Sequence, residues 1–225
     1  MITKLPRWVW TGAWALAFIA GMINVVGLLG FRHQAITHLT GTTSLLATAL
    51  AAFDGTLVLH FSLMICSFVG GTVLSGFIIQ DSTLKLGRRY GAALLLESLM
   101  LCSAVLLFER HADSGIYLAS CACGLQNAMV STYSGAVIRT THLSGMFTDL
   151  GISLGHALRG LPLDWLRLRL CLIIISAFLS GGVAGAFCFH HLGYSTLLIP
   201  AAFTGLSALV YGLQSFTTKP SRGDQ

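Results

Sequence analysis

The sequence predicts an all-α integral membrane protein with six transmembrane helices in two inverted three-helix repeats, each with a short re-entrant helix. Two observations carry this prediction, and the first is composition. Of the 225 residues, 55% are hydrophobic and only 9% are charged, against roughly a quarter charged in a typical soluble domain. The second is an internal duplication. We expect a single membrane domain over residues 1–225, with repeats near 9–108 and 116–213 and a short tail at 214–225.

The duplication is carried by a pentapeptide and by the segment before it. Thr37-His38-Leu39-Thr40-Gly41 returns 104 residues later as Thr141-His142-Leu143-Ser144-Gly145. Upstream, Gly21-Met22-Ile23-Asn24 aligns with Gly124-Leu125-Gln126-Asn127 at an offset of 103 residues. Because two motifs keep nearly the same offset, the duplication covers an architecture and not one short peptide.

A transmembrane helix needs about 20 mainly apolar residues. Six segments meet this length: Val9–Phe31, Leu57–Ile79, Gly91–Phe108, Ile116–Ile138, Leu170–Phe189 and Tyr194–Leu213. Two further segments, Gly41–Phe53 and Gly145–Arg159, are shorter and more polar, and each follows its copy of the pentapeptide. They either re-enter the membrane or cross it as short tilted helices.

The basic residues favour six crossings. Cytoplasmic loops of membrane proteins are enriched in Lys and Arg. If the short segments do not cross and both termini are cytoplasmic, 11 of the 13 basic residues lie inside and only Arg32 and Arg110 lie outside. If both short segments cross, the distribution becomes 8 inside and 5 outside. Three crossings per repeat invert the second repeat, an arrangement typical of transporters with a site near the membrane midplane.

The short segments are candidates for half-helices that start deep in the membrane. Thr40 and Ser144 are suitable N-cap residues, and Gly41 and Gly145 would open the two helices. The two N-termini would then face each other, and their free N–H groups and positive dipole ends would attract an anion, a carbonyl or water. The alternative is a pair of ordinary short helices capped at the membrane surface.

The paired motifs resemble those of the YoaK-type bacterial membrane proteins, a domain-of-unknown-function family. The resemblance runs from about Trp10 to Leu213 and rests on the two Asn-containing segments and the two His-Leu-Thr/Ser-Gly segments. It implies a multi-pass protein of the bacterial inner (plasma) membrane. The chain departs from it at Asn24, where many members have Asp, and at Thr42, where many have Asn.

Polar side chains inside apolar spans are the candidates for function. We expect solute binding by amides, hydroxyls, imidazoles and motif backbone groups: Asn24, His38, Thr40, Gly41, Gln126, Asn127, His142, Ser144 and Gly145. The alternative for these residues is structural, as hydrogen bonds between helices or within the loops. Glu97, in the middle of a span, and Asp149 with His156, two turns apart on one helix face, are candidates for proton coupling. Their alternatives are a protonated, hydrogen-bonded Glu and a helix face in contact with cytoplasmic water.

Several other classes of function are not favoured. The six cysteines all fall in apolar spans, where they behave as small apolar residues, so we expect no metal and no cofactor. Nucleotide-binding loops, zinc-protease motifs and serine-hydrolase elbows are missing from the sequence. The net charge of +5 comes from bases beside the spans, which indicates lipid headgroups and not nucleic acid.

The sequence therefore predicts a non-enzymatic membrane protein that passes a small solute between its two repeats. Its expected partners are membrane lipid and the solute, and a homo-oligomer is compatible with the sequence. One alternative is an accessory or assembly protein that transports nothing. A less favoured one is an intramembrane enzyme, which would need Asp149, His156 and Glu97 to converge.

Overall fold

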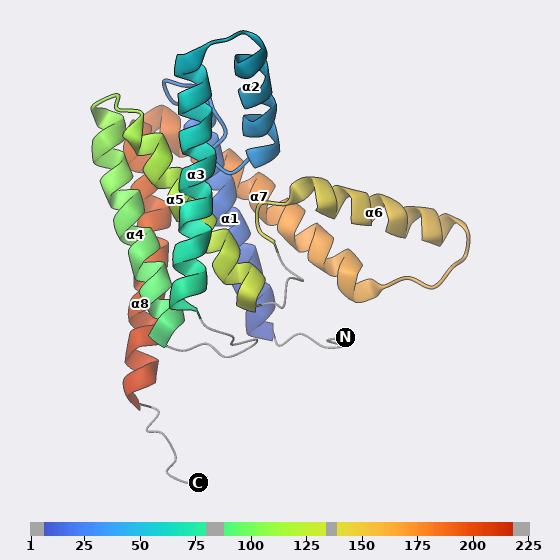
Figure 1. Cartoon of the computed structure of the whole chain (residues 1–225). Helices are drawn as coiled ribbons and strands as arrows, with labels where there is room; N and C mark the ends of the chain where they lie inside the picture. Colours follow the sequence, from blue (N-terminus) through green and yellow to red (C-terminus); the bar gives the residue numbers. More distant parts are fainter. Residues whose placement is uncertain (1–6, 80–87, 134–138, 218–225) are drawn as a thin grey trace.

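A computed structural model describes residues 7–79, 88–133 and 139–217, and over these residues the chain is helical with no strand (Figure 1). In chain order the elements are α1 Arg7–Leu29, α2 Leu39–Ala51, α3 Gly55–Ile78, α4 Arg88–Glu109, α5 Ser114–Tyr133, α6 Leu143–Leu158, α7 Trp165–Leu192, the 3₁₀ helix η1 Gly193–Leu197 and α8 Leu198–Thr217.

The six apolar segments that the sequence marks as spans coincide with α1, α3, α4, α5, α7 and α8. Residues 134–138 of the fourth span and residues 218–225 of the tail lie outside the described residues. Four helical stretches among the described residues are long and apolar enough to cross a membrane: Val9–Leu29, Gly55–Ile78, Arg89–Glu109 and Trp165–Tyr211. They indicate a multi-pass helical membrane protein.

Two buried apolar clusters lie at opposite ends of the helix bundle. One contains Ile23, Phe61 and Phe108, and we call its side of the molecule the Phe108 end. The other contains Val9 and Tyr90 and marks the Tyr90 end. The way each helix passes from one cluster to the other fixes its direction, so α1, α4 and α7 run toward the Phe108 end while α3, α5 and α8 run away from it.

Glycines allow two helix pairs to approach backbone to backbone. α1 packs along α7, and α3 packs along α5 (Figure 1). A Cβ added at any of four glycines would overlap a carbonyl oxygen of the facing helix: Gly21 with Phe178, Gly181 with Phe18, Gly71 with Cys121, and Gly124 with Phe68. Because each overlapped atom belongs to backbone, these contacts need glycine and hold the helices at one separation.

Both short helices begin two residues earlier than the sequence predicts. His38 is the N-cap of α2 and His142 is the N-cap of α6, and neither side chain makes a capping hydrogen bond. The prediction of Thr40 and Ser144 as N-caps was therefore wrong. Its physical reason lies in Thr37, which is bonded to Asn24 in α1 and so brings the chain into position for a helix directly afterwards.

The ends of the short helices differ in how well they match expectation. α2 ends at Ala51, Phe53 takes a positive φ of 54°, and Asp54 caps α3 by accepting a hydrogen bond from the Leu57 N–H at 3.0 Å. The residue that follows the predicted segment Gly41–Phe53 is thus the cap of the next helix. α6 ends as predicted, with Arg159 at the C-cap and Gly160 at a φ of 68°.

Candidate functional site

A cavity of about 360 Å³ lies between the first turns of α2 and α6, and we call it the central cavity. Nine of its thirteen lining residues are polar. Its walls also include Phe68 and Phe178, each 13 residues into its helix and so about 20 Å from the helix start. The lining residues are Asn24, Thr37, His38, Leu39, Thr40, Phe68, Asn127, Arg139, Thr141, His142, Leu143, Ser144 and Phe178.

Asn24 is held in one orientation by the first residue of the pentapeptide. The Thr37 backbone N–H donates to Asn24 Oδ1 at 3.0 Å, and the Thr37 hydroxyl donates to the same atom at 2.9 Å. A backbone N–H can only donate, so the atom that receives it is the amide oxygen. Asn24 is only 9% exposed, and its Nδ2 group has no hydrogen-bond acceptor among the described residues.

Asn127 repeats this arrangement from α5. The Thr141 hydroxyl lies 3.2 Å from Asn127 Oδ1 and donates to it. Within the described part of the chain, the Asn127 Nδ2 group also has no acceptor, and Asn127 lines the central cavity. Each amide is therefore oriented by the threonine that opens the following motif, with its oxygen occupied.

The two histidines fold back over the first turns of their helices. A Cβ on Gly41 would lie 2.8 Å from His38 Nδ1, and a Cβ on Gly145 would overlap the His142 ring. The spacing His-x-x-Gly thus leaves room for an imidazole against the helix. Gly41 and Gly145 do not themselves line the central cavity; Gly41 lines a neighbouring cavity of about 200 Å³ that also contains His38 and Gln34.

The helix starts contribute backbone donors to the central cavity. The first hydrogen bonds of the two helices run from Thr42 N–H to the His38 carbonyl at 3.1 Å and from Met146 N–H to the His142 carbonyl at 3.3 Å. The N–H groups before these residues precede the helical ladder, and helix N-termini carry a positive partial charge. Arg139 adds a full positive charge to the lining.

Four other candidates from the sequence lie away from this cavity. Gln126 is fully buried, and its side-chain nitrogen and oxygen have no hydrogen-bond partner among the described residues. Glu97 is fully buried as well, and both its carboxylate oxygens are without a partner in the described ranges. Asp149 pairs with Arg167 at 2.7 Å, while His156 lies exposed in the last turn of α6. The roles of Glu97, Asp149 and His156 in proton coupling stay predictions, as does the predicted solute binding by Gln126, which does not line the central cavity.

The intramembrane enzyme alternative needs Glu97 to meet Asp149 and His156. Glu97 lies on α4, and the other two residues lie on α6. In the described part of the structure α4 and α6 do not contact each other. Glu97 is therefore held apart from Asp149 and His156 among the described residues.

A hydrogen-bonded cluster at the Phe108 end was missed by the sequence analysis. His60, which is buried in α3, bonds through Nδ1 to the Tyr117 hydroxyl and through Nε2 to Gln34 Oε1, both at 2.8 Å. Beside it, Arg32 makes two hydrogen bonds to the Asp113 carboxylate, with Nε 2.7 Å from Oδ1. The Arg32 side chain holds the pKa of Asp113 below its usual value. The one available signal in the sequence was a lone histidine inside an apolar span, and it does not reveal the partners of that histidine.

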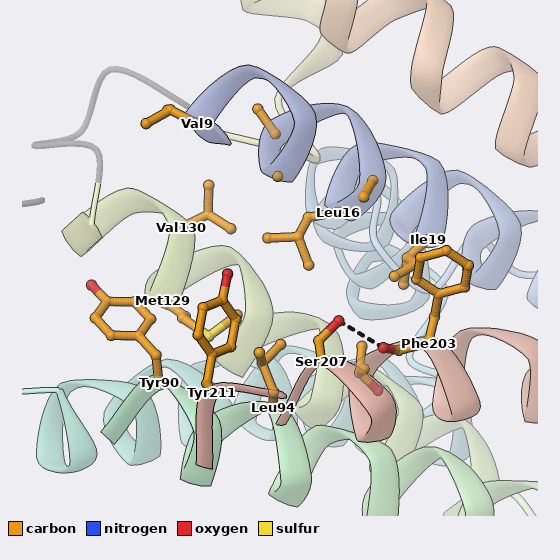
Figure 2. Close-up of a pocket in the computed structure, with 14 residues that line it drawn as sticks. Val9, Leu16, Ile19, Tyr90, Leu94, Met129, Val130, Phe203, Ser207 and Tyr211 are labelled. Carbon is orange, nitrogen blue, oxygen red and sulfur yellow. Dashed lines mark hydrogen bonds between the residues drawn. The ribbon is translucent and has the colours of Figure 1, made fainter. Parts of the chain in front are cut away.

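A smaller cavity of about 130 Å³ lies between α1, α4, α5 and α8 toward the Tyr90 end (Figure 2). Its lining is mainly apolar and includes Leu16, Leu94 and Met129. The Ser207 hydroxyl on its wall donates to the Phe203 carbonyl at 2.8 Å, so that group is already engaged. This cavity suits an acyl chain or another apolar group, and it is not the polar site.

Comparison with known proteins agrees with the resemblance carried by the motifs. The model of one protein family, described as a protein of unknown function (DUF1275), matches residues 12–210. Neither the curated proteins nor the solved structures contain a match to this chain. The YoaK-type resemblance is consistent with this match. Because the matched region covers most of the 225 residues, the chain belongs to the DUF1275 family.

Proposed function

We propose that this protein is a transporter or channel-like protein that passes a small solute across a bacterial inner membrane through the central cavity. One observation carries the proposal: two motif copies 104 residues apart come together around a single polar cavity. Polar groups are costly at membrane depth unless they line a cavity or bind each other. Here nine of the thirteen lining residues are polar, and the oriented amides have donor groups left over.

The packing of the helices supports six crossings and two inverted repeats. α1 and α5 carry the two motif asparagines and run in opposite directions between the two buried clusters. Gly21 of α1 meets Phe178 of α7, and Gly124 of α5 meets Phe68 of α3 in the same way. By these contacts α1 in the first repeat corresponds to α5 in the second, and α3 corresponds to α7. In this arrangement the Tyr90 end faces the cytoplasm, with both termini there.

The positions of the short helices support re-entrance from opposite surfaces. Thr37 contacts α1 at Asn24, five residues before the helix ends, which is about 8 Å below that end. Thr141 contacts α5 at Asn127, six residues before its last residue, or about 9 Å from the opposite end. α2 then returns beside α3, and α6 returns beside α7 (Figure 1). Neither α2 nor α6 therefore starts as deep as the membrane midplane. The central cavity fills the space between the two helix starts.

The size of the central cavity limits the solute. A volume of about 360 Å³ lies at the lower end of the range for small-molecule sites, which is roughly 300–1,000 Å³. A solute of a few non-hydrogen atoms and its remaining water would fit. Glu97 remains our candidate for coupling to protons because its buried carboxylate has no partner among the described residues.

The proposal is tested by solute entry into proteoliposomes, measured by stopped-flow light scattering with small neutral and anionic solutes. We expect the double variant Asn24→Leu/Asn127→Leu to abolish the protein-dependent entry, because it removes both amide side chains that line the cavity. Gln126→Leu is the matched control, since it removes an amide next to Asn127 that does not line the cavity. Entry that is equal in the wild type and the double variant, or in the wild type and empty liposomes, would favour an accessory protein that transports nothing.

A further inference from the structure

We propose that the central cavity is an anion-binding site, so that the transported solute is a small anion such as a monovalent inorganic ion or a short carboxylate. The statement about the transported solute rests on the proposed function. Anion binding by the cavity, however, can be measured without transport. It follows from the direction of the polar groups around the cavity, beginning with the two amides.

Each motif asparagine presents hydrogen-bond donors to the cavity. The Asn24 oxygen already accepts two hydrogen bonds from Thr37, and the Asn127 oxygen accepts one from Thr141. An amide whose oxygen is occupied on one side has its NH₂ group on the other. Both residues line the central cavity, Asn24 is more than nine-tenths buried, and neither NH₂ group has an acceptor among the described residues. A donor on a side chain as buried as that of Asn24 needs an acceptor, and a bound anion would supply it.

The backbone adds donors and positive potential at the same place. α2 and α6 are 13 and 16 residues long, and the first turn of each lines the cavity. Each helix start is equivalent to roughly half a positive charge, and its first N–H groups are not used by the helix. Two such starts from opposite repeats face one cavity, so their potentials add where the solute would sit.

The charged side chains favour the same sign. Arg139 is the charged residue of the lining, and no carboxylate lines the cavity among the described residues. The closest carboxylate along α6, Asp149, is paired with Arg167 at 2.7 Å. A cation entering the cavity would meet donors and positive potential with no carboxylate to compensate its lost hydration. An anion would meet amide, backbone and guanidinium donors.

Binding is tested on protein that has been delipidated in a neutral detergent, so that a lipid phosphate cannot occupy the site. Nitrate and formate are titrated calorimetrically at constant ionic strength. We expect saturable binding by the wild type and a loss of affinity of roughly tenfold or more in Asn24→Asp and Asn127→Asp, because each places a like charge beside the anion. Asn24→Asp keeps the acceptor for both Thr37 hydrogen bonds, so a thermal melt like that of the wild type shows that the fold is retained. Binding that survives in both Asp variants, or binding by phosphate-bearing lipid alone, would overturn the proposal.

Flux measurements separate this inference from the proposed function. In proteoliposomes with an applied K⁺ diffusion potential, we expect nitrate efflux by the wild type, a reduced rate in Arg139→Gln, and an unchanged rate in Arg159→Gln, whose exposed side chain does not line the cavity. If neutral solutes pass, stop in the double Leu variant, and anions do not pass, the anion inference fails and the transport proposal stands. If nitrate binds and the Asp variants lose it while nothing passes, the anion site stands and the transport proposal fails.

Discussion

The contact between α3 and α5 gives a sharp test of the fold, because two adjacent glycines of α3 have opposite surroundings. A Cβ on Gly71 would overlap the Cys121 carbonyl oxygen and would lie 2.8 Å from both the Cys121 carbonyl carbon and the Leu125 nitrogen. A Cβ on Gly70 would have no heavy atom within 4 Å. Gly71→Ala therefore inserts a methyl group between two backbones, and Gly70→Ala adds it to open space.

The expected magnitude follows from this geometry. The closest normal approach of a carbon to a carbonyl oxygen is about 3.3 Å. Because backbone atoms cannot rotate away, α3 and α5 must separate by more than about 1 Å. Overpacking of this kind costs about 1–3 kcal/mol. Gly70→Ala instead gains about 0.5–1 kcal/mol because alanine loses less conformational entropy in a helix. The two variants should differ by about 1.5–4 kcal/mol, or roughly 3–16 °C in melting temperature for a chain of this size.

The assay is thermal unfolding of both purified variants and the wild type in one detergent, followed by intrinsic fluorescence or by loss of the monodisperse gel-filtration peak. We expect Gly71→Ala below the wild type and Gly70→Ala at or above it. Gly124→Ala, which would overlap the Phe68 carbonyl oxygen from the other helix, should behave like Gly71→Ala. Melting temperatures for Gly71→Ala and Gly70→Ala that agree within about 2 °C would refute the close α3–α5 crossing.

Three further predictions concern single interactions. Asp54→Ala removes the N-cap of α3 and should cost about 1 kcal/mol in thermal unfolding, whereas Asp54→Asn should retain most of it. Tyr117→Phe leaves Nδ1 of the buried His60 ring without its partner and should lower the free energy of unfolding by about 1–3 kcal/mol. An unchanged melting temperature would mean that water replaces the tyrosine hydroxyl at that nitrogen. The pKa of Asp113 is lowered by its hydrogen bond to Arg32, so the pair stabilises the fold above the ordinary carboxyl pKa, and this contribution is lost as pH falls through the lowered one. Both side chains are partly exposed, so Asp113→Asn should remove at most about 1 kcal/mol at neutral pH, with the difference from the wild type vanishing in acid.

The positions of the long helices could be predicted from the sequence because hydrophobic length alone constrains them. The segments around Val9–Phe31 and Leu57–Ile79 coincide with α1 and α3 to within a few residues at each end. The meeting of the two motifs could also be expected, since a duplicated element packed in opposite directions brings equivalent residues together. Asn24 and Asn127 line one cavity for that reason.

The rest of the site depends on side-chain direction, which the sequence does not show. Gln126 is adjacent to Asn127, but neighbours on a helix point about 100° apart, and only Asn127 lines the cavity. Gly70 and Gly71 differ in the same way. His60 was missed because its partners lie 26 and 57 residues away in the chain, a separation that no local pattern reveals.

The chemistry of the cavity depends on two loop threonines, and the two copies of the motif differ in how firmly they hold their amides. Asn24 Oδ1 accepts from both the backbone and the hydroxyl of Thr37, but Asn127 Oδ1 accepts from the Thr141 hydroxyl within the described part of the chain. Thr37→Val therefore leaves Asn24 held by a backbone N–H, whereas Thr141→Val releases Asn127, whose amide can then turn its oxygen toward the cavity. We expect anion affinity to fall further in Thr141→Val than in Thr37→Val, measured by the same nitrate titration. Equal losses in the two variants would mean that the threonines act on the loop backbones and not on the direction of the amides.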